Sequence, residues 1–368
     1  MTEGREAPAP AAAVDRDTPT ADQLSLVRRL RQPRTIISIV LPILLLALFI
    51  RGLPGFKLDE LPGKILQANP LLLLAALGIF YLGFPLRGLR WALLVRPTGY
   101  DLGVRDATEI IFLSWLVNCL VPAKLGDVYR AWLLKINSPV SLSRTFGTVF
   151  IERVLDLFAI VVLGLAAGFV SFRTGLPGDV QIVFAIGVAF VIVLAGGLLT
   201  MRNLGRRALM RLPVPHRFLE LYDRFEEGVF SSIGLSALPR LVVLTGLIWG
   251  TEATRLYLVV QALGFPVHLG ISGAFFVALS ASLLTAVPLT PAGIGFVEGG
   301  IVGLLTLVYA VPQTEALAIT LVDRAVSVLS IIIFGSIAYA ISGKRRGLGM
   351  RDSPATRSGT ALRQDHAP

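Results

Sequence analysis

The chain lacks most of the residue types on which soluble enzymes rely. Of its 368 residues only 16% are charged, against about 25% in an average soluble domain. A single cysteine, Cys119, excludes a disulfide scaffold and a multi-cysteine zinc site, and we expect its thiol to be inert. The histidines are scattered without metal-ligand spacing: His216, His268 and His366. These absences exclude an ordinary cytosolic enzyme, and we expect no bound metal or cofactor.

Apolar residues and arginine dominate what is present. Hydrophobic residues make up 54% of the chain, the mean hydropathy is +0.73 and the formal net charge is +10. Such a charge fits either a nucleic-acid partner or arginines held on the cytoplasmic side of a membrane. Residues 1–27 and 342–368 are polar, and we expect both to be disordered tails. Arg28–Arg34 precede the apolar run Thr35–Ile50 without a cleavage site, which predicts a retained first span rather than a signal peptide.

Several further apolar segments approach the ~20 residues that a helix needs to cross a bilayer. Two of them, 106–136 and 270–311, are interrupted by proline and glycine, in NCLVPAKLGDVYRA (118–131) and TAVPLTPAGIGFVEGG (285–300). We expect each to be a re-entrant hairpin of two broken helices that returns to the side from which it entered. The predicted fold class is an all-α polytopic membrane protein with these two hairpins and six full spans, at 35–53, 70–91, 145–172, 180–200, 241–262 and 316–341.

The placement of the 34 lysines and arginines favours this arrangement over a nucleic-acid partner. With both termini in the cytoplasm, 27 of them face the cytoplasm, as the positive-inside rule demands. If 106–136 crossed the membrane instead, four cations would move outside: Lys124, Arg130, Lys135 and Arg144. In this topology Trp91, which follows Arg87 and Arg90, is typical of an interfacial aromatic belt. The remaining cations lie outside (Arg51, Lys57, Lys64, Arg173) or within spans (Arg153, Arg255, Arg324).

The two broken regions resemble each other, which indicates an internal duplication. Arg90 matches Arg255 at an offset of 165 residues, and the pair Glu152-Arg153 matches Asp323-Arg324 at an offset of 171. Within the breaks the offset is 169, and it relates Leu120, Pro122, Ala123 and Gly126 to Leu289, Pro291, Ala292 and Gly295. The units span about 70–172 and 239–341 within a transmembrane domain at 28–341, and the count of crossings makes them antiparallel. Inverted repeats with broken helices are typical of secondary transporters.

The segment 201–240 between the repeat units is rich in arginine. Within it, apolar residues recur at helical spacing and form one face: Phe218, Leu221, Tyr222, Phe225 and Val229. We expect this cytoplasmic segment to form a helix that lies on the membrane surface.

Ionisable residues within the spans are the first candidate functional residues, because they are costly in a membrane and usually face a protein interior or cavity. Under one hypothesis they form internal salt bridges that fix helix packing. Under the other, some arginines bind an anionic headgroup while some carboxylates gate the path or relay protons. The candidates are Glu152, Arg153 and Asp156 in one span, Glu252 and Arg255 in the next, and Asp323 and Arg324 in the last.

The breaks supply the second set of candidates. Their prolines and glycines present helix ends within the membrane, and helix N-termini there favour an anion such as phosphate. The break residues are Pro122, Gly126, Pro291, Gly293 and Gly295, flanked by Asn118, Lys124, Asp127 and Arg130 on one side and Glu298 on the other. The alternative is that the breaks merely turn two helices and that Lys124 and Arg130 extend to the membrane interface.

Four motifs together resemble one family. NCLVPAKLGDVYRA, FIERVLDL, PLTPAGIGFVEG and DRAVSVL are similar to the flippase-like transmembrane region of lysylphosphatidylglycerol synthases, also called UPF0104, over about 70–341. The family's usual Glu is replaced here by Asp127. The resemblance implies a multi-pass protein of the cell (inner) membrane that moves an aminoacylated or other anionic lipid between leaflets. Synthases of the family carry a soluble aminoacyl-transfer domain after the membrane region, and we expect none within 342–368.

The leading hypothesis is therefore a lipid translocator, not an enzyme, that moves an anionic or aminoacylated phospholipid or a lipid-linked headgroup. A membrane-embedded transferase or phosphatase is the first alternative, but it needs a nucleophile and a base, and no histidine lies in the predicted core. The second alternative is an accessory partner of a separate synthase or glycosyltransferase. The expected ligand is a membrane lipid, with no nucleic acid.

Overall fold

The computed structural model describes residues 60–121, 124–172, 178–200, 216–232, 236–267, 269–285 and 290–344, together with Leu44. Several sequence-based expectations therefore lie outside the described residues. These are the tails at 1–27 and 345–368, the first span at 35–53, the arginine-rich stretch 201–215, and the break residues Pro122, Ala123 and Leu289.

The described part of the chain is built from helices and contains no strand, which confirms the all-α membrane fold class. The first half contains α3 (Glu60–Leu66), α4 (Pro70–Val95), α5 (Val104–Leu120), α6 (Leu125–Asn137) and α7 (Leu142–Ser171). Then follow α8 (Gly178–Thr200), α10 (His216–Ser232), α11 (Leu238–Leu263), α12 (Ile271–Leu284), α13 (Phe296–Gly303), α14 (Gln313–Arg324) and α15 (Ser330–Ile341). Helix α13 continues through a π-helical turn at Leu304–Val308, and a second π turn at Ala325–Leu329 joins α14 to α15.

Four of these helical stretches are long and apolar enough to cross a membrane: Pro70–Thr98, Leu142–Ser171, Pro291–Val308 and Gln313–Ile341. Helix α11 has 26 residues, about 39 Å at 1.5 Å per residue, but carries charged residues in its middle. The stretch Pro291–Val308, which we expected to be one arm of a hairpin, has 18 residues and is therefore as long as a short span.

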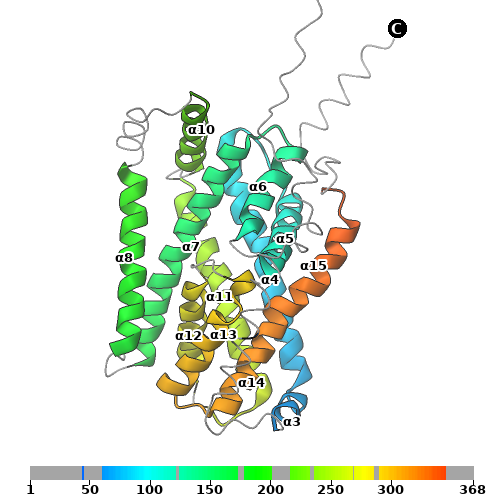
Figure 1. Ribbon diagram of the computed structural model, residues 1–368, viewed down its shortest axis with the longest axis vertical. Helices are drawn as coiled ribbons and strands as arrows, with labels where there is room; N and C mark the ends of the chain where they lie inside the picture. Colours follow the sequence, from blue (N-terminus) through cyan, green and yellow to red (C-terminus); the bar gives the residue numbers. More distant parts are fainter. Residues whose placement is uncertain are drawn as a thin grey trace, which may run out of the picture.

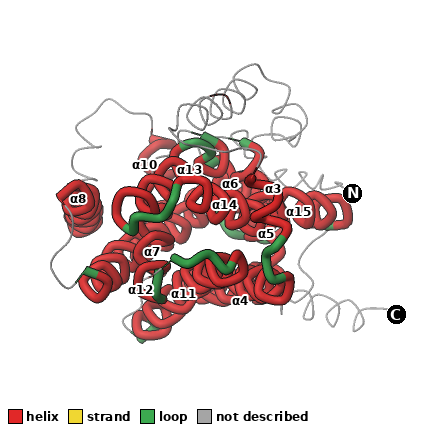
Figure 2. The backbone as a smooth tube through the Cα atoms, turned by 90° about the horizontal axis from the view of Figure 1, so that it is seen from below, coloured by secondary structure: helices red, strands yellow, loops and turns green. Residues whose placement is uncertain are grey.

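The two broken segments form hairpins at opposite ends of the molecule (Figure 1). Helices α5 and α6 lie at the end that also holds α10, whereas α12 and α13 lie toward the end that holds α3. Helices α4 and α11 cross the molecule in opposite directions and pack side by side, as both views show (Figures 1 and 2). The described helices thus have the arrangement expected of an inverted repeat.

Local sequence explains where the central helices begin and end. Helix α4 starts at Pro70, and the Asn69 side chain before it accepts hydrogen bonds from two amides of the first turn. Helix α7 starts after Ser141, whose hydroxyl accepts from the amide of Arg144 at 3.2 Å. Helix α11 ends at Gly264, where a φ of 63° suits glycine.

The interfacial role expected for Trp91 is wrong. Helix α4 continues to Val95, so Arg87, Arg90 and Trp91 lie inside it and are almost completely buried, at 5%, 1% and 0% exposure. The Trp91 ring nitrogen donates a hydrogen bond to the Thr148 hydroxyl at 3.2 Å, and the guanidinium of Arg130 lies 4.8 Å from its ring centre. Arg87 and Arg90, which we had counted as cytoplasmic, belong to the core because carboxylates of other helices pair with them.

The amphipathic helix expected within 201–240 is present as α10, and part of its apolar face packs on α7, whereas Leu221 of that face is exposed. Phe225 contacts Phe150 with ring centres 5.7 Å apart, and Val229 is fully buried. Gly147 of α7 and Gly228 of α10 permit this close approach, since a Cβ at Gly147 would lie 2.6 Å from the amide nitrogen of Val229.

Candidate functional site

A cavity of about 210 Å³ lies between the two halves of the molecule. Residues of both hairpins, of α4 and α11, and of α7 and α14 line it. Apolar and aromatic side chains such as Phe80, Trp115 and Trp249 form part of its wall. The charged wall residues are Arg87, Lys124, Glu152, Arg153, Asp156, Glu252, Arg255, Asp323 and Arg324.

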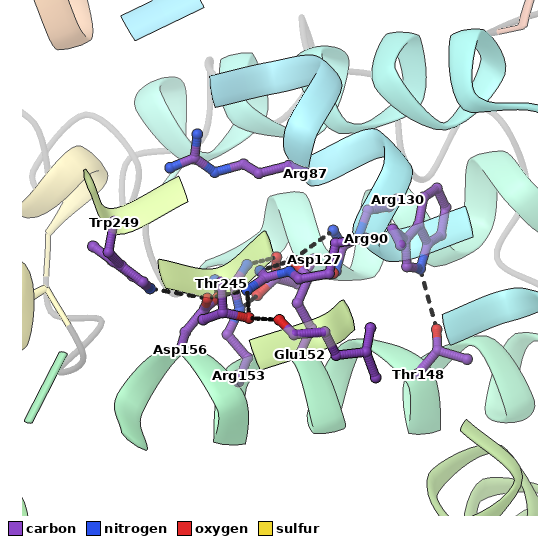
Figure 3. Close-up of polar contacts among 12 residues, drawn as sticks. Arg87, Arg90, Asp127, Arg130, Thr148, Glu152, Arg153, Asp156, Thr245 and Trp249 are labelled. Carbon is purple, nitrogen blue, oxygen red and sulfur yellow. Dashed lines mark hydrogen bonds and ion pairs between the residues drawn. The ribbon is translucent and has the colours of Figure 1, made fainter. Parts of the chain in front are cut away.

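Helix α7 presents Glu152 and Asp156, four residues apart, to the same arginine of α4 (Figure 3). Arg90 lies 3.2 Å from Glu152 Oε1 and 2.7 Å from Asp156 Oδ1. Arg130 of α6 lies 3.2 Å from Glu152 Oε2, and Trp249 of α11 donates from its ring nitrogen to Asp156 Oδ1 at 3.2 Å. Arg130 is buried, so the alternative in which its side chain extends to the membrane interface is wrong.

The first hairpin is fastened to α7 by a two-pronged ion pair. Arg153 Nη2 lies 2.7 Å from Asp127 Oδ1, and its Nε lies 3.0 Å from Oδ2, a geometry that suits the planar guanidinium. Asp127 is in the first turn of α6. At the break, Lys124 has a φ of 50°, and the amide of Gly126 donates to the Asn118 side chain at 2.8 Å.

The second hairpin is fastened to α14 in the same way. Arg324 Nε lies 2.7 Å from Glu298 Oε1, and its Nη2 donates to the carbonyl of Ala292 at 2.6 Å. Glu298 also accepts from the amide of Gly295 at 2.6 Å. In both hairpins the paired arginine and carboxylate are 26 residues apart in the chain. The backbone at this break is left-handed as well, with φ of 71° at Gly293 and 90° at Gly295, and Pro291 is buried beside it.

The ion pairs of the central helices α4 and α11 also follow the internal repeat. Arg90 pairs with Glu152, and its counterpart Arg255 pairs with Asp323 at 3.2 Å as well as with Glu252 at 3.5 Å. Arg87 and Glu252, themselves 165 residues apart, pair with each other at 2.6 Å. A twofold axis between α4 and α11 would bring equivalent positions near it into contact, so this salt bridge agrees with the duplication expected from the sequence.

One further pair of contacts obeys the same symmetry. Arg90 donates to the Thr245 hydroxyl at 3.0 Å, and Arg255 lies over the ring of Phe80 at 5.3 Å. Positions 80 and 245 are separated by 165 residues, as are 90 and 255. The crossing of α4 and α11 therefore brings equivalent residues to equivalent places even where their chemistry differs.

Of the candidate residues that the structure describes, nearly all surround this cavity or pair with its wall. Arg153 and Arg324 each pair with a carboxylate and also line the cavity, as expected, with side-chain exposures of 34% and 15%. Both hypotheses for these arginines therefore retain support. No group of His, Cys, Asp and Glu among the described residues could hold a metal.

The sequence did not identify Arg87, Arg90, Thr245 or Trp249 as site residues, although Arg90 was matched with Arg255 in the repeat. Arg87 could have been found, because it precedes Arg90 by three residues on one helix face and matches Glu252 at the repeat offset. No charge, spacing or repeat match in the sequence identifies Thr245 or Trp249 as a site residue.

Comparison with known proteins places the chain in a family. The family described as "Lysylphosphatidylglycerol synthase TM region" matches residues 35–335. A UPF0104 membrane protein of Methanocaldococcus jannaschii is 36% identical over 229 residues, which cover 61% of this chain and 93% of that protein. A UPF0104 membrane protein of Methanothermobacter thermautotrophicus is 27% identical over 306 residues, covering 77% and 89%.

A third relative is larger. The glycosyltransferase AglD of Haloferax volcanii is 28% identical over 362 residues, which cover 87% of this chain but only 56% of that protein. This chain thus spans little more than half the length of that relative. The match over most of the chain, the 36% identical relative and the helical fold together show that the chain is a membrane protein of the lysylphosphatidylglycerol synthase transmembrane-region family.

Proposed function

We propose that the protein is a lipid translocator of the cell membrane that moves an anionic or aminoacylated phospholipid, or a lipid-linked headgroup, between leaflets. The observation that carries the proposal is the cavity between the two halves, to whose wall both hairpins contribute and which ionisable residues of both halves line. Ionisable groups within a membrane usually mark a substrate path. Inverted repeats with binding at their interface are the general architecture of alternating-access transporters.

The two hairpin ion pairs suggest how a headgroup would be handled. Arg153 fastens one hairpin through Asp127, and Arg324 fastens the other through Glu298. A lipid phosphate entering the cavity would compete with these carboxylates for the same guanidinium groups. Exchange of partners at one arginine would loosen one hairpin while the other stays fastened, so the cavity would open on one side at a time.

Reconstitution into liposomes tests this function directly. Fluorescent phospholipids are added, and the fraction of headgroups that dithionite reduces from outside is followed with and without protein. We expect translocation by the wild-type chain and its loss in Arg153→Gln and Arg324→Gln. Because each substitution also leaves a carboxylate unpaired, variants are compared at equal amounts of folded protein. Full translocation by both variants would show that these arginines serve helix packing and not lipid transport.

The comparison with AglD favours one second function. Since this chain matches about half of a protein named as a glycosyltransferase, it could serve as the membrane partner of a separate glycosyltransferase. Co-purification of the tagged full chain with such an enzyme, together with absent translocation in liposomes, would support that alternative. An activity of its own on a headgroup is less well supported, because the cavity wall holds no histidine among the described residues and its carboxylates pair with arginines.

A further inference from the structure

The ionic network around the cavity contains one more cation than it has carboxylates. We define this network as the charged wall residues together with the residues that pair with them directly. It holds seven cations and six carboxylates among the described residues. The cations are Arg87, Arg90, Lys124, Arg130, Arg153, Arg255 and Arg324, and the carboxylates are Asp127, Glu152, Asp156, Glu252, Glu298 and Asp323.

The excess charge can be assigned to Lys124. Each of the six arginines has a carboxylate oxygen within 3.2 Å, and each carboxylate has an arginine. Lys124 lines the same cavity, but no carboxylate of the described residues forms an ion pair with it. Its ammonium group is therefore the cation of the network that a ligand can bind without first displacing a protein carboxylate.

The position of Lys124 makes it specific to one half of the molecule. It precedes Leu125, the first residue of α6, at the break of the first hairpin, and it is only partly exposed. At the repeat offset of 169 the second hairpin has Gly293, which is also left-handed but carries no charge. The repeat thus supplies matching ion pairs from both halves but a free cation from one half only.

We propose that the cavity binds a phosphodiester monoanion through Lys124 and thereby selects phospholipids whose headgroup carries no cation. An unmatched charge is costly in a site of low dielectric constant, and one net negative charge would neutralise the network. A zwitterionic headgroup, including that of phosphatidylglycerol aminoacylated with a neutral amino acid, would leave the excess positive charge in place, and a lysylated phosphatidylglycerol, which carries two amines, would increase it. The inference rests on the proposed translocation for the lipid's route, and it narrows the substrate class to anionic lipids that are not aminoacylated.

Binding to the purified full chain in detergent tests the proposal without measuring transport. The probe is dihexanoyl phosphatidylglycerol, the zwitterionic comparator is dihexanoyl phosphatidylcholine, and the soluble comparator is glycerophosphoglycerol. Because Trp115 and Trp249 line the cavity, tryptophan fluorescence reports occupancy. We expect phosphatidylglycerol to bind at least about tenfold more tightly than phosphatidylcholine, because the choline cation leaves the excess positive charge of the network without a counter-charge.

Substitutions at Lys124 then test whether this residue causes the difference in affinity between the two lipids. Lys124→Met should weaken phosphatidylglycerol binding by about tenfold or more and weaken phosphatidylcholine binding less, because it removes the excess positive charge that favours the anionic lipid, whereas Lys124→Arg should retain most of the affinity. Lys135→Met is the matched control, since Lys135 lies in the last turn of α6, the helix that Lys124 precedes, and is not part of the cavity wall. If Lys124→Met does not fold, the comparison of the two lipids on the wild-type chain still decides the matter.

Three results would overturn the proposal. These are equal affinity for the two lipids, unchanged phosphatidylglycerol binding in a folded Lys124→Met protein, and equal binding of glycerophosphoglycerol and the lipid, which would assign the site to soluble phosphate esters. Failure of translocation with intact Lys124-dependent binding would instead contradict only the proposed function. Translocation that is indifferent to headgroup charge would contradict only this inference.

Discussion

At the scale of single residues, the site depends on arginine rather than lysine for its ion pairs. The fork of a guanidinium can satisfy a carboxylate with two parallel hydrogen bonds, as Arg153 does with Asp127 at 2.7 and 3.0 Å. Arg324 uses the same fork for two different acceptors, Glu298 and the carbonyl of Ala292. A lysine could not hold a hairpin tip in one orientation by these contacts, so Arg→Lys is not a conservative change here.

A double-mutant cycle on Arg324 and Glu298 tests this view of the second hairpin. Arg324→Gln leaves the Glu298 carboxylate buried without its cation, and we expect a loss of about 3–5 kcal/mol of stability. Adding Glu298→Gln should recover much of that loss, because a neutral pair leaves no unpaired charge. Arg153→Gln should cost less, since the side chain of Arg153 is 34% exposed and that of Arg324 is 15% exposed. Thermal unfolding in detergent measures the wild type, both single variants of the cycle, the double variant and Arg153→Gln, and strictly additive losses within the cycle would contradict the pairing.

At the scale of elements, the sequence predicted the helices and breaks better than the partners of their charges. The hairpin breaks near 122 and 291 followed from proline and glycine, whose backbone requirements are local. The end of α4 was placed too early, at residue 91, because hydropathy falls where Arg87 and Arg90 begin. Their burial depends on Glu252 and Asp156, carboxylates far away in the chain, and periodicity within one helix contains no information about such contacts.

Gly126 provides the test at this scale. A Cβ at this position would collide with the carbonyl of Ser114 and lie 2.6 Å from the side-chain Cγ and Oδ1 of Asn118, both on the facing helix α5. We expect Gly126→Val to separate the two helices of the first hairpin, lower the unfolding temperature, with a cost of about 1–3 kcal/mol from overpacking, and abolish translocation. Gly78→Val is the control, since nothing lies within 4 Å of a Cβ there. Equal unfolding temperatures for the two variants would show that the close approach of α5 and α6 is not needed.

At the scale of the whole molecule, duplication is the feature that sequence offsets detected and side-chain contacts now describe. The offsets of 165 and 171 between matched arginines were read from the sequence, but the contact of Arg87 with Glu252 across the axis was not. A repeat seen in sequence relates positions within each half; it does not say which faces of the halves meet. Both breaks were expected to bind an anion, and residues of both line the cavity. The contacts between α4 and α11 that complete its wall could not be predicted from composition or spacing.

Orientation in the membrane is the last prediction at this scale. The end of the molecule that holds α10 also gathers the cations at the ends of neighbouring helices, among them Arg96, Arg105, Lys135 and Arg144, whereas the opposite end holds Lys64 on α3 (Figure 1). By the positive-inside rule we expect the α10 end to face the cytoplasm.

Cysteine labelling in intact cells checks this orientation. The native Cys119 is buried, so we expect it to give little background labelling. A cysteine in place of the exposed Arg224 on α10 should react with a membrane-impermeant maleimide only after the cells are opened. A cysteine in place of Gln67, which is exposed beside α3, should react in intact cells. Since the two positions lie at opposite ends of the molecule, labelling of both from one side would contradict the inverted arrangement. If instead position 224 reacts in intact cells and position 67 only after the cells are opened, the orientation is reversed, and so is the direction from which a lipid reaches Lys124.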